Sequence, residues 1–161
     1  MLVQLTNMKF ILALFLAVVS VVVAEVPTGC VTILNTSKNT YLKAANVYDK
    51  KHRHVKHAKG AENWEIQKSG NNYRIMHVKH QEYLFASYWT FNEANYVYLW
   101  MPKTDEESDK WEIQLYPGAS FYYIKNIKRG SCMFPSIFEW IYAMKDFSCH
   151  APDELWKIEK C

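Results

Sequence analysis

The sequence predicts an all-β domain of about twelve short strands, and two observations carry this prediction. One pattern of strand-forming residues recurs three times along the chain, and turn-forming residues separate its members. Outside the first 24 residues, no segment combines the apolar periodicity of a helix with capping residues. We therefore expect one β-domain behind an N-terminal segment of a different kind.

The N-terminal segment, residues 1–24, has the pattern of a cleaved secretory signal peptide. One charged residue, Lys9, precedes an apolar run from Phe10 to Val23, and a small residue, Ala24, follows. The run is shorter than the roughly 20 apolar residues that span a bilayer. The sequence thus predicts a signal peptide at 1–24, a mature domain at 25–161, and secretion into the extracellular space. Without Lys9, the predicted mature domain has 18 basic and 16 acidic residues, a net charge of +2. A charge so close to zero does not indicate nucleic-acid binding.

The repeat has two blocks, which recur in the same order in each copy. The first block centres on an isoleucine, and an apolar pair begins eight residues later; the isoleucines are Ile33, Ile75 and Ile124. The second block reads acidic-x-Trp-x-Ile, and its tryptophans are Trp64, Trp111 and Trp156. Another extended segment lies between the blocks, around Val55, at 96–100 and at 140–144. Four strands in each of three pseudo-repeats give the arrangement of a closed β-trefoil, with the repeated isoleucines and tryptophans in a shared core.

The four cysteines all lie in the mature part of the chain, which predicts two disulfides in an exported protein. Three pairings are open. We favour Cys30 with Cys161, because they stand at the two ends of the domain and chain ends often lie close together. Cys132 and Cys149 would then close a local loop.

The threefold tryptophan pattern resembles the β-trefoil superfamily, whose ricin-B-type lectins carry a Gln-x-Trp triplet in each repeat. Here Glu62, Asp109 and Glu154 stand at the position of that glutamine. In its layout of signal peptide, short mature chain, four cysteines and many tryptophans, the whole chain also resembles the cysteine- and tryptophan-rich secreted salivary family of Culex mosquitoes. This resemblance implies export into saliva and a non-enzymatic role at the feeding site.

A dense basic run lies between Lys50 and Lys59 and is the main candidate site for anions or glycans. Several cations on one loop and strand raise the local concentration of anions, and an arginine can form two bonds to one oxyanion. The alternative is a solvated strand face. The candidate residues are Lys50, Lys51, His52, Arg53, His54, Lys56, His57 and Lys59.

Asn35 begins an Asn-Thr-Ser sequon, which predicts N-linked glycosylation in an exported chain if the side chain is exposed. The histidines lack the ligand spacing of a structural zinc site, so we predict no metal and no cofactor. The sequence also lacks the nucleophile elbow, the zinc-protease helix and the phosphate-binding glycine loop, so no catalytic residues are predicted.

The predicted function is recognition of an extracellular host protein or sulfated glycan, without membrane insertion and by a monomer. Three loops that differ between the copies would carry it: 46–59, 88–96 and 135–140. Trp89, Trp100 and Trp140 do not follow the repeat and are candidates for surface contacts. The alternatives are a divergent lectin or glycosaminoglycan-binding trefoil, and a protease inhibitor of the Kunitz soybean type.

Overall fold

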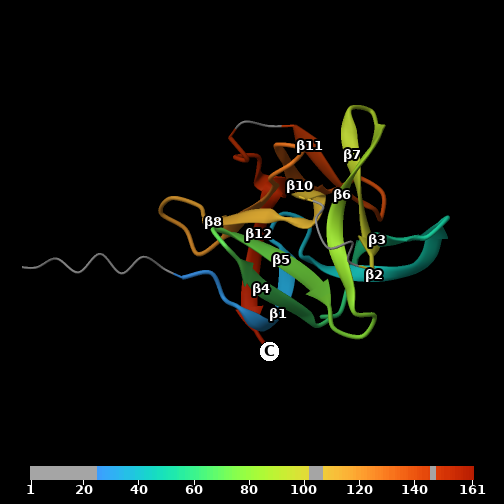
Figure 1. Cartoon of the computed structure of the whole chain (residues 1–161). Helices are drawn as coiled ribbons and strands as arrows, with labels where there is room; N and C mark the ends of the chain where they lie inside the picture. Colours follow the sequence, from blue (N-terminus) through green and yellow to red (C-terminus); the bar gives the residue numbers. More distant parts are fainter. Residues whose placement is uncertain (1–24, 102–106, 146–147) are drawn as a thin grey trace, which may run out of the picture.

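The computed structural model describes residues 25–101, 107–145 and 148–161, and the all-β prediction is confirmed (Figure 1). The predicted signal peptide at 1–24 lies outside the described residues. Within these residues, no helix is long and apolar enough to cross a membrane. One sheet joins twelve described strands, and two 3-10 helices, η1 at Glu107–Asp109 and η2 at Pro152–Glu154, accompany it. The strands are β1 Gly29–Asn35, β2 Thr40–Asp49, β3 His52–Ala58, β4 Trp64–Ser69, β5 Asn72–His77, β6 Glu82–Phe91, β7 Ala94–Trp100, β8 Trp111–Leu115, β9 Tyr122–Asn126, β10 Ser131–Pro135, β11 Ile141–Lys145 and β12 Leu155–Lys160.

The strand pairing repeats after every fourth strand. In each group of four, the first strand pairs with the second and the fourth, and the second pairs with the third. Neighbouring groups are joined by β4–β5, β8–β9 and β12–β1. These antiparallel pairings close β1, β4, β5, β8, β9 and β12 into a barrel, which leaves these strands without an open edge.

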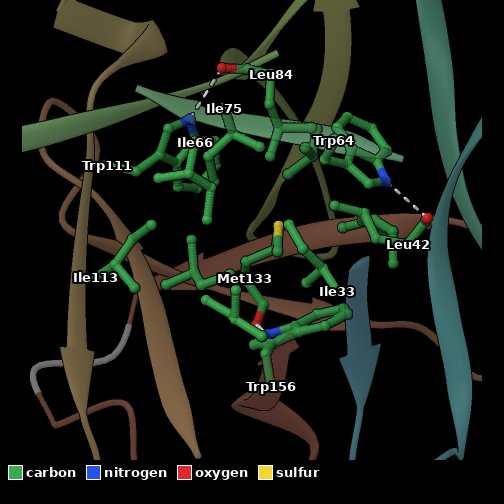
Figure 2. Close-up of a cluster of buried hydrophobic side chains, with 14 of the residues drawn as sticks. Ile33, Leu42, Trp64, Ile66, Ile75, Leu84, Trp111, Ile113, Met133 and Trp156 are labelled. Atoms are coloured by element: carbon green, nitrogen blue, oxygen red, sulfur yellow. Dashed lines mark hydrogen bonds between the residues drawn. The ribbon is translucent and has the colours of Figure 1, made fainter. Parts of the chain in front are cut away.

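The repeated isoleucines and tryptophans lie in the interior, as the repeat predicts (Figure 2). Ile33, Ile75 and Ile124 are each fully buried. Each is the register partner of the isoleucine in a Trp-x-Ile segment, in the pairs Ile33–Ile158, Ile75–Ile66 and Ile124–Ile113. Because side chains alternate along a strand, this register places all six isoleucines on the inner face.

The three repeated indoles make one hydrogen bond each, with the same geometry. Trp64 Nε1 donates to the carbonyl oxygen of Leu42 at 2.9 Å, Trp111 Nε1 to that of Leu84 at 2.9 Å, and Trp156 Nε1 to that of Met133 at 3.0 Å (Figure 2). A buried indole N–H without a partner would cost free energy. The fourth strand of each group is thereby tied to the second strand of the same group.

The glycosylation prediction at Asn35 is wrong for the folded chain, because this side chain is fully buried. Asn35 Nδ2 donates to the carbonyl oxygen of Asp153 at 2.8 Å, and Asn35 Oδ1 accepts from the backbone N–H of Lys38 at 3.0 Å. Asn126 makes the same two kinds of bond in the third group, and His77 takes this position in the second. The sequon asparagine is thus a structural residue that fixes the turn after β1 and holds it against η2.

Two disulfides are present, Cys30–Cys161 and Cys132–Cys149, and this is the pairing that the sequence favoured. The Cα–Cα distance is 5.5 Å in both. The first bridge lies beside the β1–β12 pairing and joins the two ends of the described domain, 131 positions apart. The second spans 17 positions and ties β10 to the segment before η2.

Candidate ligand-binding site

The three loops in which the sequence places function lie on three hairpins that pair with one another. These hairpins are β2–β3, β6–β7 and β10–β11. β7 pairs with β3 on one side and with β11 on the other, and a bridge between Lys56 and Trp140 joins β3 to the third hairpin. The non-repeating parts of the chain therefore meet in one region.

The basic run does not form the continuous cationic surface that the sequence predicted. It includes all of β3, where alternation turns Arg53 and Val55 inward. Arg53 is 6% exposed, and its Nε lies 2.7 Å from Glu82 Oε2 while one terminal nitrogen donates to the carbonyl oxygen of Ala45 at 3.1 Å. The prediction that Arg53 would present its guanidinium to an external oxyanion is therefore wrong.

The remaining members of the run have separate surroundings. Lys56 pairs with Glu139 at 3.6 Å, and His57 Nε2 lies 2.7 Å from the carbonyl oxygen of Phe138. Lys59 Nζ donates to the carbonyl oxygen of Asn39 at 3.0 Å, while Lys51 is exposed. The ammonium group of Lys50 lies 5.1 Å from the ring centre of Trp89, within the range of a cation–π contact.

His52 and His54 face away from the core and contact the non-repeating aromatic residues. The His52 ring centre lies 4.9 Å from that of Trp100, 5.2 Å from that of Phe85 and 6.0 Å from that of Trp89. His54 lies 4.8 Å from Trp140. Burial lowers the pKa of His54, with a smaller opposing effect of Asp49. The three tryptophans that break the repeat are half-buried and lie along the outer face of β3.

A cavity of about 400 Å³, here called the aromatic pocket, opens beside these rings. Its volume falls within the range of roughly 300–1,000 Å³ that is usual for small-ligand sites. Part of its lining is aromatic, and the turn between β9 and β10 adds two cations. The lining residues are His52, Phe85, Ala86, Ser87, Tyr88, Trp89, Trp100, Ser108, Lys128 and Arg129.

The turn that carries Lys128 and Arg129 is held by the buried Asn126. Asn126 Oδ1 accepts from the backbone N–H of Arg129 at 3.1 Å, and Asn126 Nδ2 donates to the carbonyl oxygen of Ser108 at 2.8 Å. Arg129 Nε also donates to the carbonyl oxygen of Ala86 at 3.4 Å. The cations are therefore placed by the fold, which lowers the ordering cost of binding.

Sequence reasoning identified His52, Trp89 and Trp100 but missed Phe85, Lys128 and Arg129. The only signal for the tryptophans was that they break the repeat. The run Arg129-Gly130-Ser131 predicts a turn, but nothing local indicates that this turn faces β6 or that Lys128 and Arg129 line a pocket.

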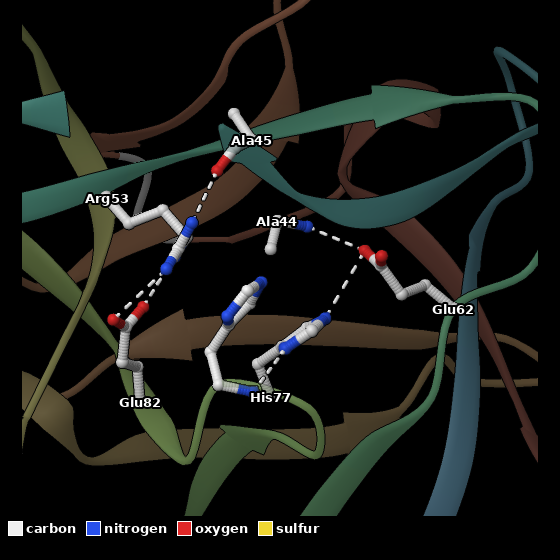
Figure 3. Close-up of polar contacts among 7 residues, drawn as sticks. Ala44, Ala45, Arg53, Glu62, His77 and Glu82 are labelled. Carbon is white, nitrogen blue, oxygen red and sulfur yellow. Dashed lines mark hydrogen bonds and ion pairs between the residues drawn. The ribbon is translucent and has the colours of Figure 1, made fainter. Parts of the chain in front are cut away.

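A partly buried polar cluster surrounds His77 (Figure 3). Glu62 Oε2 accepts from the backbone N–H of Ala44 at 2.7 Å and lies 3.4 Å from His77 Nε2. His77 Nδ1 accepts from the backbone N–H of His80 at 3.2 Å. Burial lowers the pKa of His77, and nearby Glu62 opposes this effect. A second proton on the ring would have to displace the bond from His80.

We expect the chain to lose stability as the pH falls below about 6.5, the ordinary pKa of histidine. His54, His77 and His80 all have lowered pKa values in the fold, chiefly through burial, so the unfolded chain binds more protons in this range. Stability therefore rises with pH there and is fully present above about pH 6.5. Thermal unfolding at about pH 7.5 and about pH 5.5 measures the loss.

The matched variant is His77→Asn, since asparagine stands at the equivalent positions 35 and 126 and can accept the same turn bond. This variant is expected to show a smaller loss of stability between about pH 7.5 and about pH 5.5 than the parent chain. The loss that remains would come from His54 and His80. An unchanged pH dependence would show that His77 is not a source of the effect.

The loop at 135–140 presents apolar side chains. Ile137 is 87% exposed and Phe138 is 67% exposed, and they border an open hollow of about 210 Å³ with Phe91 and Met144. The loop is ordered by a bond from the backbone N–H of Ser136 to the carbonyl oxygen of Trp140 at 2.9 Å. Among residues 25–101, 107–145 and 148–161, no group of three or more His, Cys, Asp or Glu side chains could hold a metal ion.

The chain is similar to two solved salivary proteins from Culex quinquefasciatus, both of the cysteine- and tryptophan-rich (CWRC) family. The first is 36% identical, with a TM-score of 0.79 over 86% of this chain and 97% of that protein. The second is 28% identical, with a TM-score of 0.76 over 85% of this chain and 96% of that protein. No protein-family model matches the chain, and no curated protein matches it.

A more distant likeness concerns the fold alone. A lectin from Polyporus squamosus, solved with a human-type influenza-binding epitope, is 14% identical, with a TM-score of 0.71 over 85% of this chain and 50% of the lectin. The 36% identity to the first salivary protein extends over nearly its whole length, and the pseudo-repeats, the tryptophans and the two disulfides span the described domain here. The chain therefore belongs to the CWRC family of Culex salivary proteins.

Proposed function

We propose that the chain is a secreted, non-enzymatic binding protein that holds a saccharide of an extracellular partner in the aromatic pocket. The observation that carries this proposal is the meeting of Trp89, Trp100 and Phe85 at one cavity of about 400 Å³. Pyranose rings expose apolar C–H faces, whose partial positive charge suits the negative face of an aromatic ring. Serine hydroxyls and two cations at the same cavity can bond to sugar oxygens.

Secretion is supported by the pattern of residues 1–24, by the two disulfides and by the salivary origin of the similar structures. A non-enzymatic role is supported by the chemistry of the pocket. Its described lining residues include no carboxylate, whereas most glycosidases need two carboxylates that flank the bond to be cleaved.

We also propose that the barrel is a β-trefoil. The support is the threefold pairing scheme, in which β1, β4, β5, β8, β9 and β12 form a ring and three hairpins lie beside it. The three equivalent indole bonds and the three isoleucine pairs fit the same symmetry. The Polyporus squamosus lectin, which has a similar fold and was solved with a saccharide epitope, supports the proposal that this barrel also binds a sugar.

The test is a glycan array with the mature chain, followed by calorimetric titration of the best saccharide. Trp89→Ala is expected to weaken binding by about tenfold or more, because it removes one aromatic wall of the pocket. Tyr116→Ala is the matched control, since Tyr116 is a half-buried aromatic residue outside the pocket and should leave the affinity unchanged.

A folded chain that binds no saccharide on the array would refute the proposed function. Equal loss in both variants would point to a general disturbance of the fold. Thermal unfolding of each variant, measured alongside, separates that outcome from a local effect.

A further inference from the structure

We propose a second binding site, specific for a sulfated sugar unit, in a cavity that we call the lysine pocket. The cavity has a volume of about 380 Å³ and lies between β2, β3, the β5–β6 turn and the β10–β11 loop. Lys43, Lys56, Lys79 and His80 contribute to its wall, and Trp140 forms another part. It shares none of its lining residues with the aromatic pocket.

Two of these lysines face each other directly. Lys43 on β2 and Lys56 on β3 are register partners in the hairpin. Like charges placed directly opposite one another destabilise a strand pair. Glu139 lies 3.6 Å from Lys56, but no ion pair among the described residues reaches Lys43, so an anion bound between the two lysines would reduce the remaining repulsion.

The two carboxylates of the lysine pocket are already engaged within the chain. Glu62 accepts from the backbone N–H of Ala44 at 2.7 Å and lies 3.4 Å from His77. Glu139 pairs with Lys56 at 3.6 Å, and both side chains are partly exposed, so this pair is weak. In the part of the chain that the structure describes, no ion pair includes Lys43 or Lys79. These two ammonium groups are available to a ligand.

The indole of Trp140 indicates which kind of anion fits. Inorganic sulfate or phosphate would use the lysines alone, whereas a sulfated sugar presents a ring face to the indole and a sulfate to the ammonium groups. The Trp140 ring is held from the side of β3 by His54, at 4.8 Å between ring centres. The presence of three lysines and a half-buried indole in the lining of one cavity therefore favours the sulfated sugar.

The experiment is titration of the mature chain with a heparin hexasaccharide at physiological ionic strength. The double variant Lys43→Gln/Lys79→Gln is expected to lose about tenfold or more in affinity. The control is Lys68→Gln, which removes an exposed lysine of β4 away from the pocket and should change the affinity less than about twofold. Trp140→Ala should weaken binding of the hexasaccharide as well, and inorganic sulfate at the same concentration should not compete.

Equal affinities of the double variant and the Lys68 control would overturn the proposal. An effect of the lysines without an effect of Trp140, together with competition by sulfate, would reduce the site to a simple anion site and overturn the assignment to a sugar. The proposed function is tested separately, because Trp89→Ala leaves the lysine pocket intact and the lysine variants leave the aromatic pocket intact.

Discussion

Replacing Trp111 by alanine is expected to lower the free energy of unfolding by about 3–5 kcal/mol. The indole is fully buried, so its loss removes apolar contacts and leaves a cavity. It also leaves the carbonyl oxygen of Leu84 without its donor. Urea denaturation monitored by circular dichroism measures the change. Trp64→Ala and Trp156→Ala should cost similar amounts, because their indoles are equally buried and make the same bond.

The control for this series is Trp89→Ala, which removes the same side chain from a half-buried position on the aromatic pocket. It should cost less than about 1 kcal/mol. If the three repeated tryptophans differed from one another as much as from Trp89, the account of three equivalent positions in one core would fail.

Removing the bridge between the domain ends, with Cys30→Ala/Cys161→Ala, is expected to cost about 2–5 kcal/mol of stability. This bridge closes a segment of 131 positions, so it restricts the unfolded chain strongly. The folded state loses little, because both cysteines are exposed and the β1–β12 pairing remains. Guanidinium unfolding under oxidising conditions measures the difference.

A reductant provides the control for the bridge. Once both disulfides of the parent chain are reduced, the parent and the variant should unfold at nearly the same denaturant concentration. A difference that persists in reductant would mean that the substitutions act through packing and not through the covalent link.

The core could be predicted because its residues obey two rules at once. Ile33, Ile75 and Ile124 stand in short runs of strand-forming residues, and each is followed eight residues later by an apolar pair. A residue type that recurs at the same place in every copy is expected to fill an equivalent position in the shared core. Asn35, His77 and Asn126 are also equivalent and buried, so the repeat indicates an interior position for all three. The sequon at Asn35 suggested a glycosylation site instead.

The aromatic pocket could be predicted only in part, because its residues come from distant parts of the chain, and no local sequence pattern shows that these parts are in contact. Strand alternation alone would place Arg53 on the inner face of β3. Its ion-pair partner, Glu82, lies 29 positions away on another hairpin, so the local sequence does not indicate the pair. Charge density along the sequence could not show that one of the cations is neutralised inside the protein. Lys128 and Arg129 belong to the aromatic pocket only because buried Asn126 fixes their turn beside β6.

The pairing of the first strand with the last one also has a consequence for biosynthesis. β1 meets β12 over five residue pairs, from Val31–Lys160 to Asn35–Trp156. Translation delivers β12 after the other eleven described strands, so β1 emerges long before this partner exists. Until then the nascent barrel keeps an open edge that other chains can pair with, and a chaperone or rapid closure must protect it.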